Sequence, residues 1–152
     1  MKKYSLVFII GALFALTTLA QEVEEINGIY YLDATPYSGS YVTYFENGNK
    51  KMEMNLNNGL KEGQVKVYFE SGNLNELRAY KYNLMHGSWT SYNEKKRKVG
   101  LANYRNGKKH GDWKVWDDDG NLLYEMSYSN GEKSGTWKKY DSKGNVLMER
   151  KY

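Results

Sequence analysis

The chain has 152 residues, with 22 Lys and Arg, 18 Asp and Glu, and no Cys. The lack of Cys excludes a disulfide scaffold, a Cys-ligated zinc or iron–sulfur site and a thiol nucleophile. Aromatic residues make up 15% of the chain and Pro occurs once, a composition that argues against intrinsic disorder.

Residues 1–20 have the three zones of a secretory signal peptide. Two lysines precede an eleven-residue apolar run from Leu6 to Leu16, and Ala20 is a small residue at the expected cleavage point. The run is shorter than the roughly 20 residues that a membrane-spanning helix needs. We therefore expect a helical signal segment and a mature chain that is exported to the periplasm or the extracellular space. Because Cys is absent, we do not expect a lipoprotein.

The predicted mature chain is nearly neutral. Residues 1–20 contain two lysines and no acid, so residues 21–152 have 20 basic and 18 acidic side chains and a net charge of +2. Such a chain can release few counterions from a nucleic acid. We therefore expect no nucleic-acid partner.

Residues 21–35 form a lead-in strand and an incomplete repeat, and residues 36–152 repeat every 24 residues without an insertion. Extending the period backward places Leu32 in the slot that later holds Leu56 and a series of tyrosines. An uninterrupted repeat predicts an array in which each unit packs against its neighbours. One glycine marks each unit: Gly39, Gly63, Gly87, Gly111 and Gly135.

Each unit contains two segments that alternate between apolar and polar residues, separated by turn residues. Pairs such as Asn106-Gly107 supply the positive φ of a tight hairpin turn. The pattern predicts an all-β fold, an elongated antiparallel meander of stacked β-hairpins. Lys96 stands where the other units have Gly, so we expect that hairpin to be looser or differently wound.

Two aromatic slots, three residues apart, recur in the units and contain all four tryptophans. Residues three apart point to opposite faces of a regular strand unless a bulge intervenes, and the sequence leaves this open. The rings either form the core of a thin sheet or an exposed stripe that binds proteins or glycans. The candidate binding surface consists of Tyr44, Tyr68, Trp89, Tyr92, Trp113, Trp116, Trp137 and Tyr140.

The first of these slots holds three tryptophans at successive 24-residue intervals. If Trp89, Trp113 and Trp137 form one row, the central ring contacts a neighbour on both sides. We then expect loss of Trp113 to destabilise the fold more than loss of Trp137.

The residues that could carry chemistry do not form a recognisable set. His86 and His110 share one slot, about 10 Å apart by strand spacing, whereas ligands of one ion lie about 3 Å from each other. In the run 117–119 of three Asp, Gly120 follows too soon for a calcium-binding EF-hand loop. Nucleophile-elbow and phosphate-binding motifs are absent. We expect no enzymatic activity, no metal and no cofactor.

A basic cluster interrupts the third unit. It is a candidate contact for anionic lipid or for an acidic protein surface, although such runs are more often solvated loops. The cluster consists of Lys95, Lys96, Arg97 and Lys98.

The segment 104–121 reads Y-R-N-G-K-K-H-G-D-W-K-V-W-D-D-D-G-N. It resembles the MORN repeat, and more closely its bacterial variant, and the resemblance extends over about 36–152. Departures are Val65 at an aromatic slot, and Asn83 and Lys96 at glycine slots. The resemblance implies β-hairpin ribbons that serve protein or membrane-lipid contacts, and many bacterial members carry an antitoxin label.

The sequence therefore favours an exported, non-enzymatic repeat scaffold. We expect it to bind a protein or a cell-envelope component through an aromatic β-ribbon. Two alternatives remain open. One is a peripheral membrane-lipid-binding protein, and the other, by resemblance alone, is an antitoxin-like protein.

Overall fold

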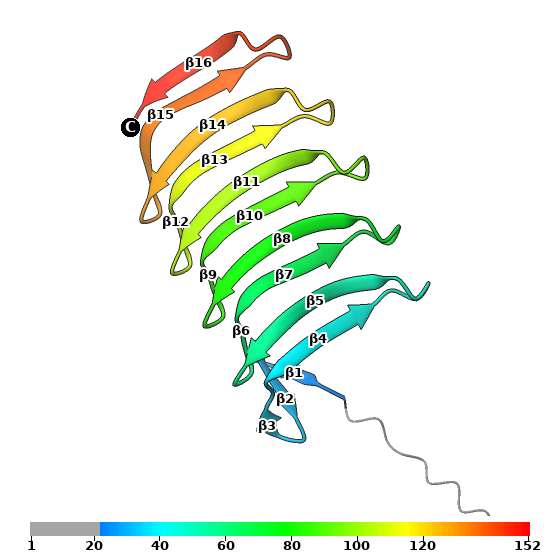
Figure 1. Ribbon diagram of the computed structural model, residues 1–152. Coiled ribbons are helices and arrows are strands. Elements are labelled where there is room, and N and C mark those ends of the chain that lie inside the picture. Colours follow the sequence, from blue (N-terminus) through cyan, green and yellow to red (C-terminus); the bar gives the residue numbers. More distant parts are fainter. Residues whose placement is uncertain (1–21) are drawn as a thin grey trace, which may run out of the picture.

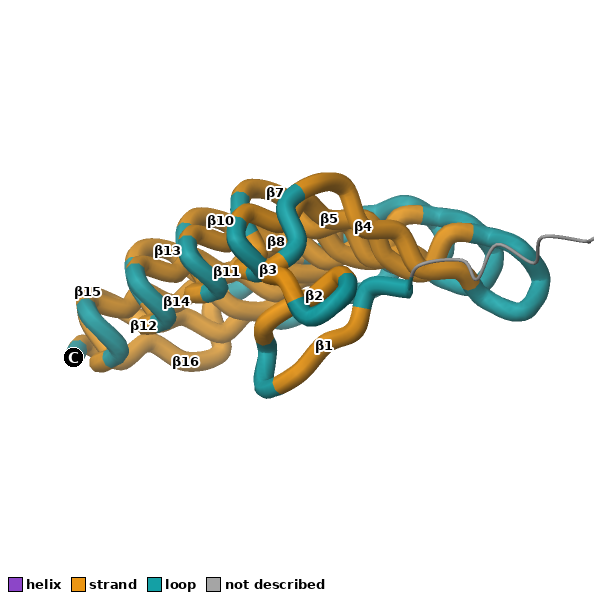
Figure 2. Tube along the Cα trace, turned by 90° about the horizontal axis from the view of Figure 1, so that it is seen from below, coloured by secondary structure: helices purple, strands orange, loops and turns teal. Residues whose placement is uncertain are grey.

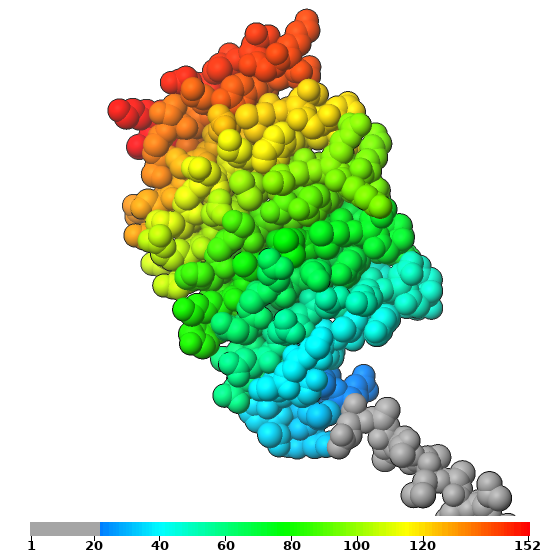
Figure 3. All heavy atoms as spheres, in the orientation of Figure 1, coloured from blue at the N-terminus to red at the C-terminus, as the bar shows by residue number. Residues whose placement is uncertain are grey.

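The computed structural model describes residues 22–152, which contain sixteen β-strands and no helix. Figure 1 shows a ladder of hairpins stacked in chain order, and Figure 3 shows an elongated body whose layers follow the sequence. The predicted all-β meander is confirmed for these residues, whereas the predicted helical signal segment, 1–20, lies outside them. Within 22–152, no helix is long and apolar enough to cross a membrane.

Three strands form a small N-terminal sheet, and thirteen form a long antiparallel sheet. The small sheet consists of β1 (Glu24–Ile26), β2 (Ile29–Leu32) and β3 (Thr35–Pro36). The long sheet consists of β4 (Gly39–Tyr44), β5 (Lys50–Asn57), β6 (Leu60–Lys61), β7 (Gly63–Tyr68), β8 (Leu74–Lys81), β9 (Leu84–Met85), β10 (Gly87–Tyr92), β11 (Lys98–Arg105), β12 (Lys108–Lys109), β13 (Gly111–Trp116), β14 (Leu122–Ser129), β15 (Glu132–Tyr140) and β16 (Val146–Lys151).

A repeat unit consists of two long paired strands and a short arm. In the fourth unit, β13 pairs with β14, and the preceding arm strand β12 pairs with the end of β11. The Asn106-Gly107 turn between β11 and β12 has φ values of +49° and +78°. Asn and Gly adopt these values at low steric cost. The Asn-Gly pairs therefore form the tight turns that the sequence predicts.

A bulge connects each arm to the strand that follows it. Tyr104 pairs with Lys109 and Leu101 pairs with Lys114, so two residues of β11 lie opposite four residues, 110–113. Bulges bend a strand and increase its twist, and the strands in Figure 1 are curved. The bulge thus separates the short arm from the long strand that follows it, and arm side chains such as Lys109 lie over aromatic rings.

The long sheet has two faces, which we call face A and face B. Direct cross-strand partners share a face, and successive residues alternate between faces. Face A contains Trp113 and its partner Met126, and face B contains Lys114 and its partner Glu125. The register is the same in every unit, so each 24-residue slot belongs to one face.

The small N-terminal sheet caps face A at the first repeat. Figure 2, seen from that end, shows β1 and β2 beside the stacked hairpins. The buried apolar residues of the described chain lie here: Tyr30, Met54, Leu56 and Val65. The Tyr30 ring lies 5.4 Å from the ring of Tyr41, and burial raises the pKa of Tyr30. The protein's core is therefore local to one end of the sheet.

The cap departs from the 24-residue period by one residue. Its turn is at Asp33 and Ala34, both with positive φ, whereas the next turn is at Asn58 and Gly59, 25 residues further on. A one-residue slip changes which side chains face the core. The prediction that Leu32 occupies the ladder slot is wrong, because it is the Tyr30 ring that lies against Tyr41.

The Lys96 hairpin has the same hydrogen bonds as the other hairpins. Lys96 adopts φ +62°, and its N–H donates to the Asn93 carbonyl at 2.8 Å, as the Gly120 N–H donates to Asp117. The prediction of a looser or differently wound turn is therefore wrong. The neighbouring turns hold this loop in the left-handed conformation, at a cost of about 1 kcal/mol for a side-chain-bearing residue.

Candidate functional site

Seven aromatic rings form a continuous ladder along face A. Each tryptophan lies between two tyrosines from the adjacent long strands, at ring-centroid distances of 4.8–5.8 Å and tilted angles of 51–62°. Tilted pairs at this distance are favourable for aromatic quadrupoles. The ladder consists of Tyr80, Trp89, Tyr104, Trp113, Tyr128, Trp137 and Tyr152.

The tryptophans also hydrogen-bond to the bulged strand. The Trp113 indole N–H donates to the Asn103 carbonyl at 3.0 Å, and the Trp137 indole N–H donates to the Ser127 carbonyl at 3.0 Å. Trp137 contacts the rings of Tyr128 and Tyr152, just as Trp113 contacts two tyrosines. The expectation of one direct tryptophan row is therefore wrong, and so is its consequence that Trp137 has fewer ring neighbours.

The predicted aromatic surface is divided between the two faces. Trp113 and Val115 lie on face A, and the bulge follows Val115. The Tyr140 hydroxyl donates to Glu125 at 2.6 Å, which places that slot on face B. The structure thus answers the question that the sequence left open, because the two slots lie on opposite faces. Face A holds Trp89, Trp113 and Trp137, and face B holds Tyr44, Tyr68, Tyr92, Trp116 and Tyr140.

Basic side chains cover the ladder rings. Lys109 Nζ lies 4.5 Å from the Trp113 ring centroid and 4.8 Å from that of Tyr128. Lys133 Nζ lies 4.6 Å from the Trp137 centroid and 4.7 Å from that of Tyr152. These distances are within the range of cation–π attraction. Neither lysine forms an ion pair within residues 22–152.

On face B, several lysines pair with glutamates. Lys114 Nζ lies 2.8 Å from Glu125, and Lys66 Nζ lies 3.1 Å from Glu53. Lys114, followed by the Tyr140 hydroxyl, lowers the pKa of Glu125. The two faces therefore differ in how their positive charges are satisfied.

A hollow of about 210 Å³ opens beside the middle of the ladder. Trp89 and Trp113 bound it, Gly100 and Ala102 line it between them, and Glu76 lies at one end. The positions of Gly100 and Ala102 hold large side chains in other units. They are Met52, Tyr124 and Met148 at the first position, and Met54, Arg78, Met126 and Arg150 at the second.

Comparison with known families identifies the repeats. The segments 37–58, 61–82 and 109–130 match the family described as MORN repeat variant. These three segments belong to the MORN repeat variant family. The units between and after the matched segments have the same paired hairpins, in β10–β11 and β15–β16. No curated protein matches the chain. MORN repeats commonly mediate protein or membrane interactions.

The two histidines connect neighbouring MORN units. His86 Nδ1 accepts a long hydrogen bond, 3.4 Å, from the Asn106 N–H, and His110 Nδ1 accepts one of 3.4 Å from the Asn130 N–H. Glu62 occupies the same slot and accepts from the Tyr82 N–H at 2.9 Å. Each side chain thus supports the next turn of the array. Within residues 22–152, no three His, Asp or Glu side chains are grouped as a metal site would require.

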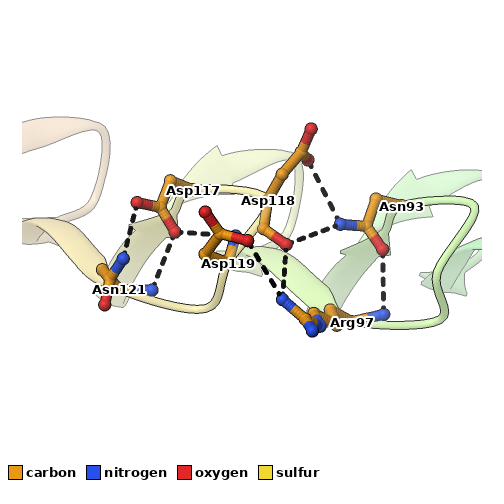
Figure 4. A network of polar contacts seen from close by, with 6 residues as sticks. All are labelled: Asn93, Arg97, Asp117, Asp118, Asp119 and Asn121. Atoms are coloured by element: carbon orange, nitrogen blue, oxygen red, sulfur yellow. Dashed lines mark hydrogen bonds and ion pairs between the residues drawn. The ribbon is translucent and has the colours of Figure 1, made fainter. Parts of the chain in front are cut away.

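The acidic loop of three Asp is a self-capped turn. Asp117 accepts from the N–H groups of Asp119 and Asn121 at 2.9 and 2.8 Å, and from the Asn121 amide at 2.9 Å (Figure 4). The Asn121 amide and N–H lower the pKa of Asp117. These bonds use the Asp117 oxygens for the turn itself.

The predicted basic cluster lies on the adjacent loop. Lys95, Lys96, Arg97 and Lys98 are exposed. Arg97 Nη1 donates to the Asp118 carbonyl at 3.0 Å and lies 3.4 Å from an Asp119 oxygen (Figure 4). Lys98 Nζ lies 6.0 Å from the centroid of the Trp116 ring. Arg97 therefore joins neighbouring loops.

The sequence showed the period of the tyrosine half of the ladder, but the candidate binding surface did not include it. Tyr80 and Tyr104 belong to a third slot with the same period, but they are 9 and 15 residues from Trp89 in the chain. The hairpin pairing of Gly87 with Tyr104 brings this slot beside the tryptophan. The lysines at positions 109 and 133 also recur at a 24-residue interval. That shared period was the available signal.

Proposed function

We propose that this MORN-repeat protein is an exported, non-enzymatic scaffold that binds a protein or another cell-envelope component through face A. One observation carries the proposal. The ladder rings are only half-buried, and those from Trp113 to Tyr152 lie beneath lysines that form no ion pair within residues 22–152, whereas the same face of the first unit is buried by the chain's own cap.

The cap supports the choice of face A. Tyr30 enters this face, packs against Met54 and Val65, and lies beneath the ammonium of Lys61, which is 5.4 Å from its ring centroid. Lys109 and Lys133 are the corresponding arm residues of later units. A partner that presents a flat or apolar group to these later units would repeat the packing that Tyr30 already makes.

Two further parts of the proposal rest on the sequence. Export rests on the signal-peptide zones of residues 1–20. The absence of enzymatic activity rests on the missing catalytic motifs, and the positions of His86 and His110 in inter-unit contacts are in keeping with it.

A pair of adjacent positions tests the binding face. Lys108 and Lys109 are both exposed, but they alternate between face B and face A. We would place a photo-activatable benzoylphenylalanine at either position in the full chain and express each variant in cells that have an envelope. The cross-linked products would be identified after cell fractionation. We expect envelope cross-links from position 109 only. Cross-links from 108 alone, or retention of the chain in the cytoplasm, would refute the proposal.

A second candidate is peripheral binding to anionic membranes, favoured by the exposed Lys95 and Lys96 on one loop. Flotation with vesicles that contain anionic lipid tests it. The double change Lys95→Gln and Lys96→Gln should reduce flotation, and unchanged flotation would remove the loop from consideration. An antitoxin-like function, which rests on family resemblance, would yield a toxin as the product cross-linked at position 109.

A further inference from the structure

Acidic residues are unevenly divided between the two faces of the long sheet, although the predicted mature chain is nearly neutral. At the paired positions of face A between β4 and β16, the one acidic residue is Glu76. Six basic residues lie on that face: Lys61, Arg78, Lys109, Lys133, Lys139 and Arg150. Face A therefore carries almost no negative charge of its own at these positions.

The basic residues of face A are arranged around aromatic rings and not around carboxylates. Of the six, Arg78 pairs with Glu76, and the other five form no ion pair within residues 22–152. On face B, only some of the basic residues have a glutamate partner, among them Lys66, Lys114 and Lys138. Cations held over rings without a counter-charge are suited to an anionic ligand.

We propose that face A binds an anionic polysaccharide, with one pyranose ring in the hollow between Trp89 and Trp113 and acidic groups paired with Lys109 and Lys133. The proposal rests on the assignment of face A as the binding face. The C–H groups of a sugar ring pack on the electron-rich indoles, while Glu76 and Ser91 at the hollow supply hydrogen-bonding oxygens for sugar hydroxyls.

The size of the hollow suits a single sugar ring. At about 210 Å³ it is smaller than the roughly 300–1,000 Å³ of drug-sized sites. Gly100 and Ala102 leave this space open because their side chains are absent or small. A methionine at position 102, as at the equivalent Met54 and Met126, would fill it.

The spacing of the rings favours a glycan over a peptide. Neighbouring ring centroids are 4.8–5.8 Å apart. Each residue of an extended glycan adds one six-membered ring and one bridging oxygen, a length close to this spacing. Same-face side chains of an extended peptide recur every roughly 6.6 Å. A peptide along the ladder would therefore lose register within a few rings.

Binding of defined oligomers by the full mature chain tests the proposal. The probes are oligogalacturonate, a neutral malto-oligosaccharide of equal length and oligoglutamate of equal charge, followed by tryptophan fluorescence and calorimetry. We expect oligogalacturonate to bind with a Kd on the order of 10 μM at low salt and more weakly as salt is added. We expect much weaker binding of the other two probes.

Matched variants separate the site from overall charge. The double variant K109Q/K133Q should raise the Kd for oligogalacturonate by about tenfold, and A102M should do the same by filling the hollow. The face B double variant K66Q/K138Q changes net charge equally and should leave the Kd within about twofold. Circular dichroism and urea midpoints would establish that each variant is folded.

Each result decides the proposal. Equal binding of oligoglutamate, equal losses in both double variants, or no binding of oligogalacturonate would overturn it. If the sugar fails to bind while the cross-linker at position 109 still captures an envelope component, this inference fails and the proposed function stands. If the sugar binds but no envelope component is cross-linked, the proposed function fails and this inference stands.

Discussion

The first repeat and the middle repeats share one hairpin but differ in what covers face A. At the first repeat, Tyr30 lies over Met54, Leu56 and Val65, and all four side chains are at most 4% exposed. In the middle repeats, rings such as Trp113 stay half-exposed beneath the arm lysines. A one-layer sheet acquires a core only where a second layer covers it. Elsewhere rings and lysine stems form the cover themselves.

The largest effect should come from breaking the cap. Tyr30→Ala removes a ring that is 2% exposed, and we expect a loss of about 3–4 kcal/mol in the free energy of unfolding. Urea denaturation measures it. Tyr31→Ala, a neighbouring and less buried tyrosine, is the control and should cost clearly less. A loss below that of Trp113→Ala would mean that the cap contributes little.

Loss of a tryptophan from the uncapped ladder should destabilise the fold less than loss of Tyr30, and by the same amount at both positions. Trp113→Ala and Trp137→Ala each remove contacts to two rings and one indole hydrogen bond of 3.0 Å. Because these rings are half-exposed, we expect each change to cost about 2 kcal/mol. Urea melts of both variants should agree within about 0.5 kcal/mol. A much larger loss for Trp113→Ala would mean that position within the array, and not the number of ring contacts, determines the loss of stability.

Replacing Lys96 in the turn of the third unit by glycine should stabilise the fold. Lys96→Gly relieves a φ of +62°, and we expect a gain of about 1 kcal/mol. Thermal or urea denaturation measures it. Lys96→Ala keeps the Cβ and should give no comparable gain. A gain from alanine equal to that from glycine would assign the effect to lysine charge.

The smallest effect concerns the ion pairs of face B, which the third unit, with Thr90 and Leu101 at the equivalent positions, lacks. Lys114 lowers the pKa of Glu125, so the stabilisation is present above the unfolded-state pKa and is lost as pH falls through the folded-state pKa. Glu125→Leu copies Leu101 of the preceding unit. The variant should lack the loss of stability at low pH that this ion pair causes in the wild type, about 0.5 kcal/mol. Urea midpoints across the acidic pH range, compared with wild type, test it. An unchanged pH profile would exclude Glu125 as the source.

The hairpin array could be predicted because its signals are local. Asn106-Gly107 specifies a tight turn from its own backbone preferences, and the alternation of Leu122–Tyr128 specifies a strand. Lys96 shows the limit of such reasoning. A turn held on both sides by the array keeps its conformation even when the favoured glycine is replaced.

The sequence by itself determined that this chain forms a repeating antiparallel sheet, because turn residues and period-two alternation act within a few residues. The tertiary structure decided the site. The strand β13 stays regular from Trp113 to Trp116, which leaves these two rings on opposite faces. A one-residue slip brought Tyr30 onto the first repeat, and the pairing of Tyr104 with Lys109 put an ammonium over the ladder. These outcomes depend on register across strands, which residue spacing along one strand does not determine.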